Sequence, residues 1–95
     1  MKQELVSLIE QTLEALKAAG KLPADASPKV MIENTKDKAH GDYASNIAMA
    51  SAKLAGMKPR DWAQEIINAL PVSPILNKAE IAGPGFINFF VTEAA

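Results

Sequence analysis

Hydrophobic and polar residues alternate with a helical period in the first fifth of the chain. Apolar side chains recur at spacings of three and four over residues 2–19, and charged or amide side chains fall between them. This spacing is typical of an amphipathic helix that buries one face. Gly20 suits the position just after such a helix, and Pro23 follows closely enough to prevent its continuation. The pattern therefore predicts a first helix over residues 2–19.

Two more helices are predicted in the middle of the chain. Residues 43–55 place mostly small side chains on one stripe, which favours close packing against a neighbour, and Gly56 ends the segment. Residues 59–70 begin with a proline, which suits the first helical position, and they stop before Pro71. Trp62 is in register with the apolar residues of this helix, so we expect it to anchor the core.

A period of two, typical of strands, replaces the helical period in three places. It predicts strands near residues 29–34, 76–82 and 86–92. The last two flank a Gly-Pro-Gly sequence at residues 83–85, which has the chemistry of a tight turn, so they should close a hairpin. The element order predicts an α+β fold in which three main helices are layered on one face of a small, largely antiparallel sheet of three to four strands. The other face of the sheet is expected to stay free.

Alternation along the last strand divides it into an apolar face and a mixed face. The apolar face is an ordinary core face and consists of Ile87, Phe89 and Val91. The mixed face places two aromatic rings on either side of an amide and consists of Phe86, Asn88 and Phe90. An amide can pair with a nucleobase edge while a ring stacks on the base, so this face is a recognition surface if it is exposed. The alternative is that this face is also covered and that Asn88 only bonds to backbone.

A polar loop over residues 36–42 separates the first strand from the second helix. Gly41 gives this loop flexibility, and Asp42 is placed to cap the helix that follows. The single histidine, His40, has no serine, carboxylate or second histidine spaced with it as a catalytic set, so we assign it no catalysis. Asn46 lies outside the small-residue stripe and could bond either to this loop or to a partner.

Composition limits the classes of function. The chain of 95 residues is expected to form one small domain, and one histidine without any cysteine offers no metal cluster. No apolar run approaches the roughly 20 residues that cross a bilayer, so we expect no membrane partner, and the lack of disulfides suits the cytoplasm. The net charge is −1, whereas nucleic-acid-binding domains normally carry a basic excess. We therefore expect the domain alone to bind RNA weakly unless a larger assembly holds it there. We also expect it to be a monomer.

Two stretches carry a family resemblance. They are Ala-His-Gly-Asp-Tyr-Ala-Ser-Asn-Ile-Ala-Met at residues 39–49 and Ala-Gly-Pro-Gly-Phe-Ile-Asn-Phe at residues 82–89. In this order, with a small-residue helix between them and both near the start of a chain, they resemble the N-terminal additional domain of arginyl-tRNA synthetase. The similarity covers essentially all 95 residues. It implies that residues 1–95 are a single tRNA-docking domain of a longer class I enzyme, which uses ATP to attach arginine to its tRNA.

The resemblance also implies site residues. In the family an aromatic residue and, one spacer later, an amide residue touch a D-loop nucleotide of tRNA, and by position these are Phe86 and Asn88. We add Phe90 and the turn glycines Gly83 and Gly85 to this expected tRNA-binding set. The first motif is expected to be mainly structural, setting the loop and the helix start, and its residues are Gly41, Asp42, Tyr43 and Asn46.

The class I catalytic signatures, a His-x-Gly-His-like turn and a Lys-Met-Ser-Lys-Ser-like loop, do not occur in this sequence. We therefore assign no catalytic residue, no metal and no cofactor to the chain. ATP is expected in the parent enzyme, whose catalytic domain would be the neighbour of this one. The alternative function is a protein-interaction module that uses the Phe86, Asn88 and Phe90 strand to pair with a partner.

Overall fold

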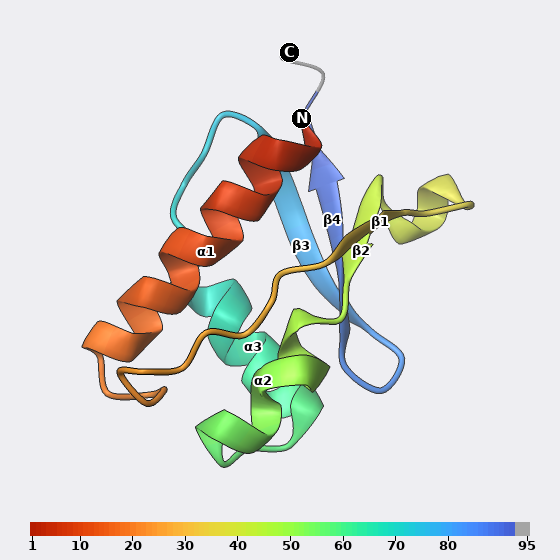
Figure 1. The fold of residues 1–95 in the computed structure, drawn as a ribbon. Coiled ribbons are helices and arrows are strands. Elements are labelled where there is room, and N and C mark those ends of the chain that lie inside the picture. Colours follow the sequence, from red (N-terminus) through yellow and green to blue (C-terminus); the bar gives the residue numbers. More distant parts are fainter. Residues whose placement is uncertain (93–95) are drawn as a thin grey trace.

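Three helices and four strands make up most of residues 1–92, which are the residues that the computed structural model describes (Figure 1). They form an α+β fold, as the sequence predicted. The elements in chain order are α1 (Lys2–Ala18), β1 (Ile32–Asn34), the short 3-10 helix η1 (Lys38–His40), β2 (Tyr43–Ser45), α2 (Ile47–Ala55), α3 (Pro59–Ala69), β3 (Leu76–Ala82) and β4 (Phe86–Val91).

The four strands form one antiparallel sheet in the order β1-β2-β4-β3. In the middle of this sheet Asn88 of β4 lies opposite Ala44 of β2 on one side and Glu80 of β3 on the other. Because β4 is paired along both sides, its backbone has no free edge for another strand. The alternative in which this strand itself pairs with a partner protein is therefore wrong.

All three helices cover the same face of the sheet, as predicted (Figure 1). Trp62 of α3 is completely buried, and its indole N–H donates to Ser51 Oγ at 2.8 Å. The Ser51 hydroxyl in turn donates to the Ile47 carbonyl at 2.6 Å. Trp62 thus anchors the core, and its one polar atom is hydrogen-bonded. The other large, fully buried side chains are Leu5, Ile9, Ile47, Ile66, Ile87 and Phe89.

The second helix begins four residues later than predicted, because residues 43–45 form β2 instead. Tyr43 pairs with Phe89 and Ser45 with Ile87, so this short strand fills the gap between β1 and β4. Its side chains alternate between the two faces, which a search for helical spacing does not register. The helix start is then marked by Ser45, whose Oγ accepts a hydrogen bond from the Ile47 N–H at 3.1 Å. Long-range pairing has overridden a local preference for helix.

The first strand is shorter than predicted. Only Ile32, Glu33 and Asn34 pair with β2, and the preceding residues 29–31 lead into the strand without pairing. The remaining predicted boundaries agree with the structure to within one residue. No helix within residues 1–92 is both long and apolar enough to cross a membrane.

Candidate functional site

The face of the sheet turned away from the helices, here called the outer face, carries the candidate site. On β4 this face presents Phe86, Asn88 and Phe90, whereas Ile87 and Phe89 on the other face are completely buried in the core. The predicted register of β4 is therefore confirmed. The neighbouring strands add acidic, basic and small side chains to the outer face, namely Glu33, Ala44, Lys78, Glu80 and Ala82.

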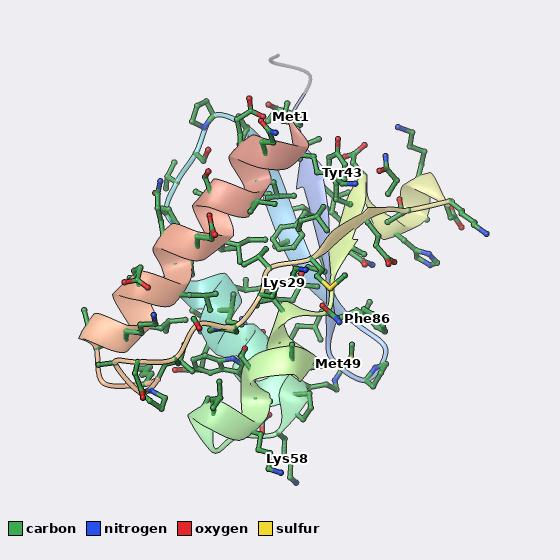
Figure 2. The ribbon with its side chains drawn as sticks, viewed as in Figure 1. Met1, Lys29, Tyr43, Met49, Lys58 and Phe86 are labelled. Atoms are coloured by element: carbon green, nitrogen blue, oxygen red, sulfur yellow. The ribbon has the colours of Figure 1, made fainter. Side chains whose placement is uncertain are left out.

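Phe86 is the exposed aromatic residue of this face, with 41% of its surface accessible. It follows the turn at residues 83–85, which rests on the helical layer. A Cβ at Gly85 would stand 2.7 Å from Pro59 Cβ and 3.2 Å from Met49 Cγ, so only glycine fits there. Arg60 of α3 donates a hydrogen bond to the Gly83 carbonyl. These contacts hold the turn that leads into Phe86, which is labelled in Figure 2.

Asn88 lies on the outer face but is only 8% exposed, so the expectation that it stands on an open surface is wrong. The loop that follows β1 lies beside it. Thr35, Lys36 and His40 line a hollow of about 370 Å³ together with Asn88 and Phe86. Among the described residues the Asn88 amide has no hydrogen-bond partner, so it does not serve the backbone either. Asn88 is a wall of a hollow, and Phe86 stands at its edge.

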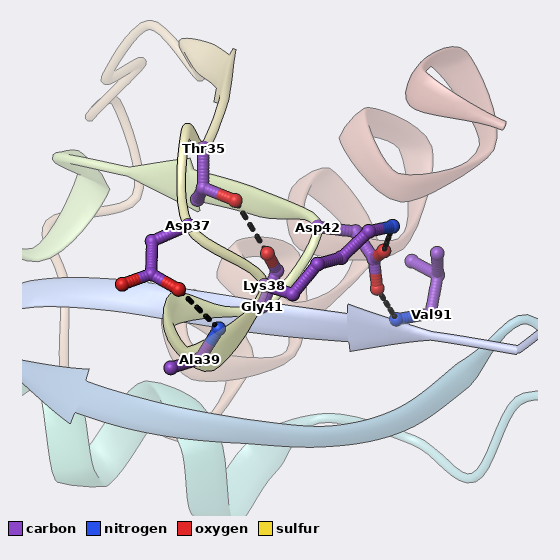
Figure 3. Close-up of polar contacts among 7 residues, drawn as sticks. All are labelled: Thr35, Asp37, Lys38, Ala39, Gly41, Asp42 and Val91. Carbon is purple, nitrogen blue, oxygen red and sulfur yellow. Dashed lines mark hydrogen bonds and ion pairs between the residues drawn. The ribbon is translucent and has the colours of Figure 1, made fainter.

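The loop over the outer face is fastened by Gly41 and Asp42 (Figure 3). Asp42 N–H donates to the Phe89 carbonyl at 2.9 Å, and Asp42 Oδ2 accepts from the Val91 N–H at 3.0 Å. A Cβ at Gly41 would come within 2.7 Å of the Phe89 carbonyl oxygen, so glycine permits this close approach. Asp42 was expected to cap the second helix. It fastens the loop to β4 instead, because β2 intervenes before α2 begins.

Further contacts tighten the same loop. Thr35 Oγ1 donates to the Gly41 carbonyl, and Asp37 Oδ1 accepts from the Ala39 N–H at 2.9 Å. The Lys38 ammonium lies 3.4 Å from Asp42 Oδ1 but is almost fully exposed. The loop is thus held by its own short polar side chains (Figure 3), which leaves Lys36 and His40 free to line the hollow.

Tyr43 and Asn46 occupy different faces. Tyr43 pairs with Phe89 and packs partly buried against the core, so it is not part of the outer face. Asn46 stands at the N-cap position of α2 but makes no capping bond with its side chain. It lines a second, smaller hollow of about 70 Å³ with Met31, Ala44 and Phe86 among its neighbours.

The ring of Phe90 is less available for stacking than the ring of Phe86. It is partly buried, and the Lys78 ammonium lies 4.4 Å from the centre of its ring. Its edge also lies 3.4 Å from the Cβ position of Gly41 in the covering loop. A cation already occupies part of this ring, so we expect Phe86 to be the stacking platform.

Sequence reasoning missed the basic rim of this site. Lys36 and His40 are exposed, as expected for that loop, and the structure also places both beside Asn88 in one hollow, which Glu33 lines as well. The alternating Lys-x-Lys-x-His pattern of residues 36–40 was the available signal. No cluster of three or more potential metal-ligating His, Cys, Asp or Glu side chains occurs in the described part of the chain. Stacking, amide pairing and cationic contacts are what this site offers a ligand.

Comparisons with known proteins agree on one family. The family model described as "Arginyl tRNA synthetase N terminal domain" matches residues 3–91. An arginine–tRNA ligase from Ectopseudomonas mendocina is 59% identical over 90 residues, which cover 95% of this chain and 16% of that protein. One from Shewanella putrefaciens is 53% identical over 95 residues, covering the whole chain and 16% of that protein. The chain thus spans about a sixth of the length of these curated relatives.

Solved structures with the same fold include two of that description. The Plasmodium falciparum arginyl-tRNA synthetase superposes with a TM-score of 0.72 at 12% identity, over 96% of this chain and 16% of that one. The Thermus thermophilus arginyl-tRNA synthetase gives a TM-score of 0.70 at 22% identity, over 97% of this chain and 14% of that one. At such low identity these two matches establish the fold alone.

Proposed function

Since this chain belongs to the arginyl-tRNA synthetase N-terminal domain family, we propose that it docks tRNA for a longer arginine–tRNA ligase. The surface that makes contact is the outer face around Phe86 and Asn88, and the part of tRNA that it grips is an unpaired nucleotide of the D-loop.

One observation carries this proposal. An exposed ring, Phe86, stands at the edge of a hollow whose wall contains the unbonded amide of Asn88. A flipped-out base can stack on such a ring while its edge pairs with the amide. The Lys36 ammonium and the His40 ring on the same rim suit the phosphates on either side of that base, while the carboxylate of Glu33, which lines the hollow too, favours the end away from the phosphates. An unpaired loop nucleotide offers a free base face for the ring, a free base edge for the amide and phosphates for the rim. In a paired nucleotide the base face is stacked on its neighbours and one base edge is occupied by the pairing partner.

The remaining steps belong to the rest of the ligase. The relatives are named as arginine–tRNA ligases, and this chain corresponds to about 16% of their length. We propose that the neighbouring catalytic domain binds ATP and arginine, in the cytoplasm, and that this domain contributes affinity for tRNA without taking part in bond making. A net charge of −1 supports this division, because the domain has little electrostatic attraction of its own for RNA.

A titration of the 95-residue chain with unmodified tRNA-Arg transcript tests the proposal. We expect Phe86→Ala to weaken binding by ~1–3 kcal/mol, the range found for stacking of one base. Val72→Ala is the matched control, since Val72 is a fully exposed apolar residue in the loop between α3 and β3. Equal affinities of the two variants for tRNA would show that the outer face is not the docking surface.

A further inference from the structure

Asn46 carries a polar group that the fold leaves unused. Its Oδ1 is closed off from solvent and has no hydrogen-bond partner within residues 1–92. A buried carbonyl without a partner is unfavourable in a native protein and calls for an explanation. The side chain makes no capping hydrogen bond to α2, and the Ile47 N–H at the helix start is bonded to Ser45 Oγ instead. A structural role for the amide is therefore not evident.

The smaller hollow places Asn46 beside the proposed base site. Asn46 directly follows Ser45, the last residue of β2, which pairs with Ile87 of β4. Together with Met31, Ala44 and Phe86 it lines this hollow of about 70 Å³. The Asn46 amide therefore lies next to the ring on which the base is proposed to stack.

The two hollows of the outer face share part of their lining. Both are lined by Glu33, Ala44 and Phe86, while Asn88 belongs to the larger one and Asn46 to the smaller one. Ala44, which lines both, has only a methyl side chain. Rotation of the Asn46 amide about its last bond exchanges the oxygen and nitrogen positions, so either atom can face the smaller hollow.

We propose that Asn46 is a second base-reading amide, which hydrogen-bonds one edge of the nucleobase that Phe86 stacks while Asn88 meets another edge. This inference rests on the proposed function, since it concerns the same nucleotide. The ligand group is a donor or acceptor atom on a nucleobase edge, which pairs with whichever amide atom of Asn46 faces the smaller hollow.

Nuclear magnetic resonance of the 15N-labelled chain tests this directly. The probes are the four nucleoside 5′-monophosphates and the unmodified tRNA-Arg transcript, and the signals are the side-chain amide resonances of Asn46 and Asn88. Both resonances should shift with one preferred nucleotide and with tRNA. Asn68 of α3, whose Oδ1 accepts from Gln64 at 2.8 Å, is the internal control and should stay in place.

Substitutions separate a reading role from a structural one. Asn46→Ala should weaken binding of the preferred nucleotide about 2- to 12-fold, the span given by one hydrogen bond, and should reduce the preference among the four bases. Its melting temperature should not fall, because the wild-type carbonyl has no partner to lose. The nearly isosteric Asn46→Asp, which keeps an acceptor but loses the donor, should fold and show the same loss of preference. Asn68→Ala is the matched control.

The outcomes distinguish this inference from the proposed function. If Asn88 and Phe86 respond to nucleotide while Asn46 does not, and Asn46→Asp keeps the wild-type base preference, the inference is wrong and the docking function stands. If Asn46→Ala unfolds or lowers the melting temperature and Asn46→Asp binds all four nucleotides as wild type does, Asn46 is structural. If none of the three residues responds to saturating tRNA, the proposed function itself fails.

Discussion

Buried polar groups on the two sides of the sheet differ in their hydrogen bonding. On the helix-covered face the buried hydroxyls are bonded: Thr12 donates to the Leu8 carbonyl at 2.8 Å and Ser51 donates to the Ile47 carbonyl at 2.6 Å. On the outer face the amides of Asn46 and Asn88 have no partner within the described residues.

The aromatic rings on the two faces also differ in burial. The core face buries Phe89 completely, while the outer face leaves the ring of Phe86 41% exposed over hollows. Complete burial and complete hydrogen bonding are typical of residues selected for stability. Stability does not explain amides without hydrogen bonds beside an exposed ring, whereas binding of a ligand would. The comparison indicates that the core side of β4 serves stability, and it supports the proposal that the outer side serves recognition.

The largest expected effect is on the core face. Phe89→Ala should lower the free energy of unfolding by ~3–5 kcal/mol, because it removes a fully buried ring and leaves a cavity. Phe86→Ala, three residues earlier on the same strand, should cost well under that because its ring is already half in water. Urea denaturation of the two variants measures both. Equal losses would contradict the division between the faces.

The second-largest expected loss of stability is at Gly41, in the loop between β1 and β2. Gly41→Ala should cost roughly 2–4 kcal/mol, since it combines a positive φ with a Cβ 2.7 Å from the Phe89 carbonyl oxygen. Gly20→Ala is the matched control: its φ is also positive, at +78°, but nothing lies within 4 Å of the added Cβ. Its cost should be only ~1–2 kcal/mol. Denaturation midpoints compare the two, and a similar loss at both positions would mean that the close approach to β4 is unimportant.

Local periodicity was sufficient to predict the helices and strands that bury one continuous face. The helices α1 and α3 and the hairpin of β3 and β4 were predicted to within one residue, because each repeats its apolar spacing over several residues. The strand β2 has only three residues, and while β1 pairs with it on one side, its partners on the other side, residues 87–89 of β4, lie more than forty positions away. A local window therefore extended the following helix through it.

Burial of Asn88 escaped prediction for the same reason. The residues chosen for the outer face of β4 do lie there, because alternation along a strand fixes which side each one occupies. Whether that side is open depends on the loop after β1, which is fastened by the contact of Asp42 with Val91. This contact joins residues 49 positions apart, and nothing in the spacing of β4 itself signals it.

A substitution at Asn88 tests the proposed recognition role of the outer face. In the full ligase that contains this domain, Asn88→Ala should cost on the order of 1–3 kcal/mol with the preferred D-loop base and reduce discrimination between D-loop variants. Stability should hardly change, because the amide has no partner in the described structure. Charging kinetics against tRNAs that differ only in the D-loop measure the effect on kcat/KM. Unchanged discrimination by a folded variant would mean that the base is read elsewhere.

The smallest expected effect concerns the basic rim of the outer face. Lys36 lines the same hollow as Asn88, and we expect its ammonium to contact a phosphate beside the bound base. A phosphate contact carries no sequence information, so Lys36→Gln should weaken binding of all tRNA variants by a similar modest factor. It should also reduce the slope of log affinity against log salt concentration by about 1.

Titrations of the chain with tRNA at several salt concentrations measure that slope. Lys2→Gln, an exposed lysine at the start of α1 in the helical layer, is the matched control with the same change in net charge. If both substitutions reduce the slope equally, the contribution of Lys36 is only its effect on overall charge. A larger reduction for Lys36→Gln would place a phosphate at the rim of the hollow, on the opposite side of the sheet from the core that Phe89 fills.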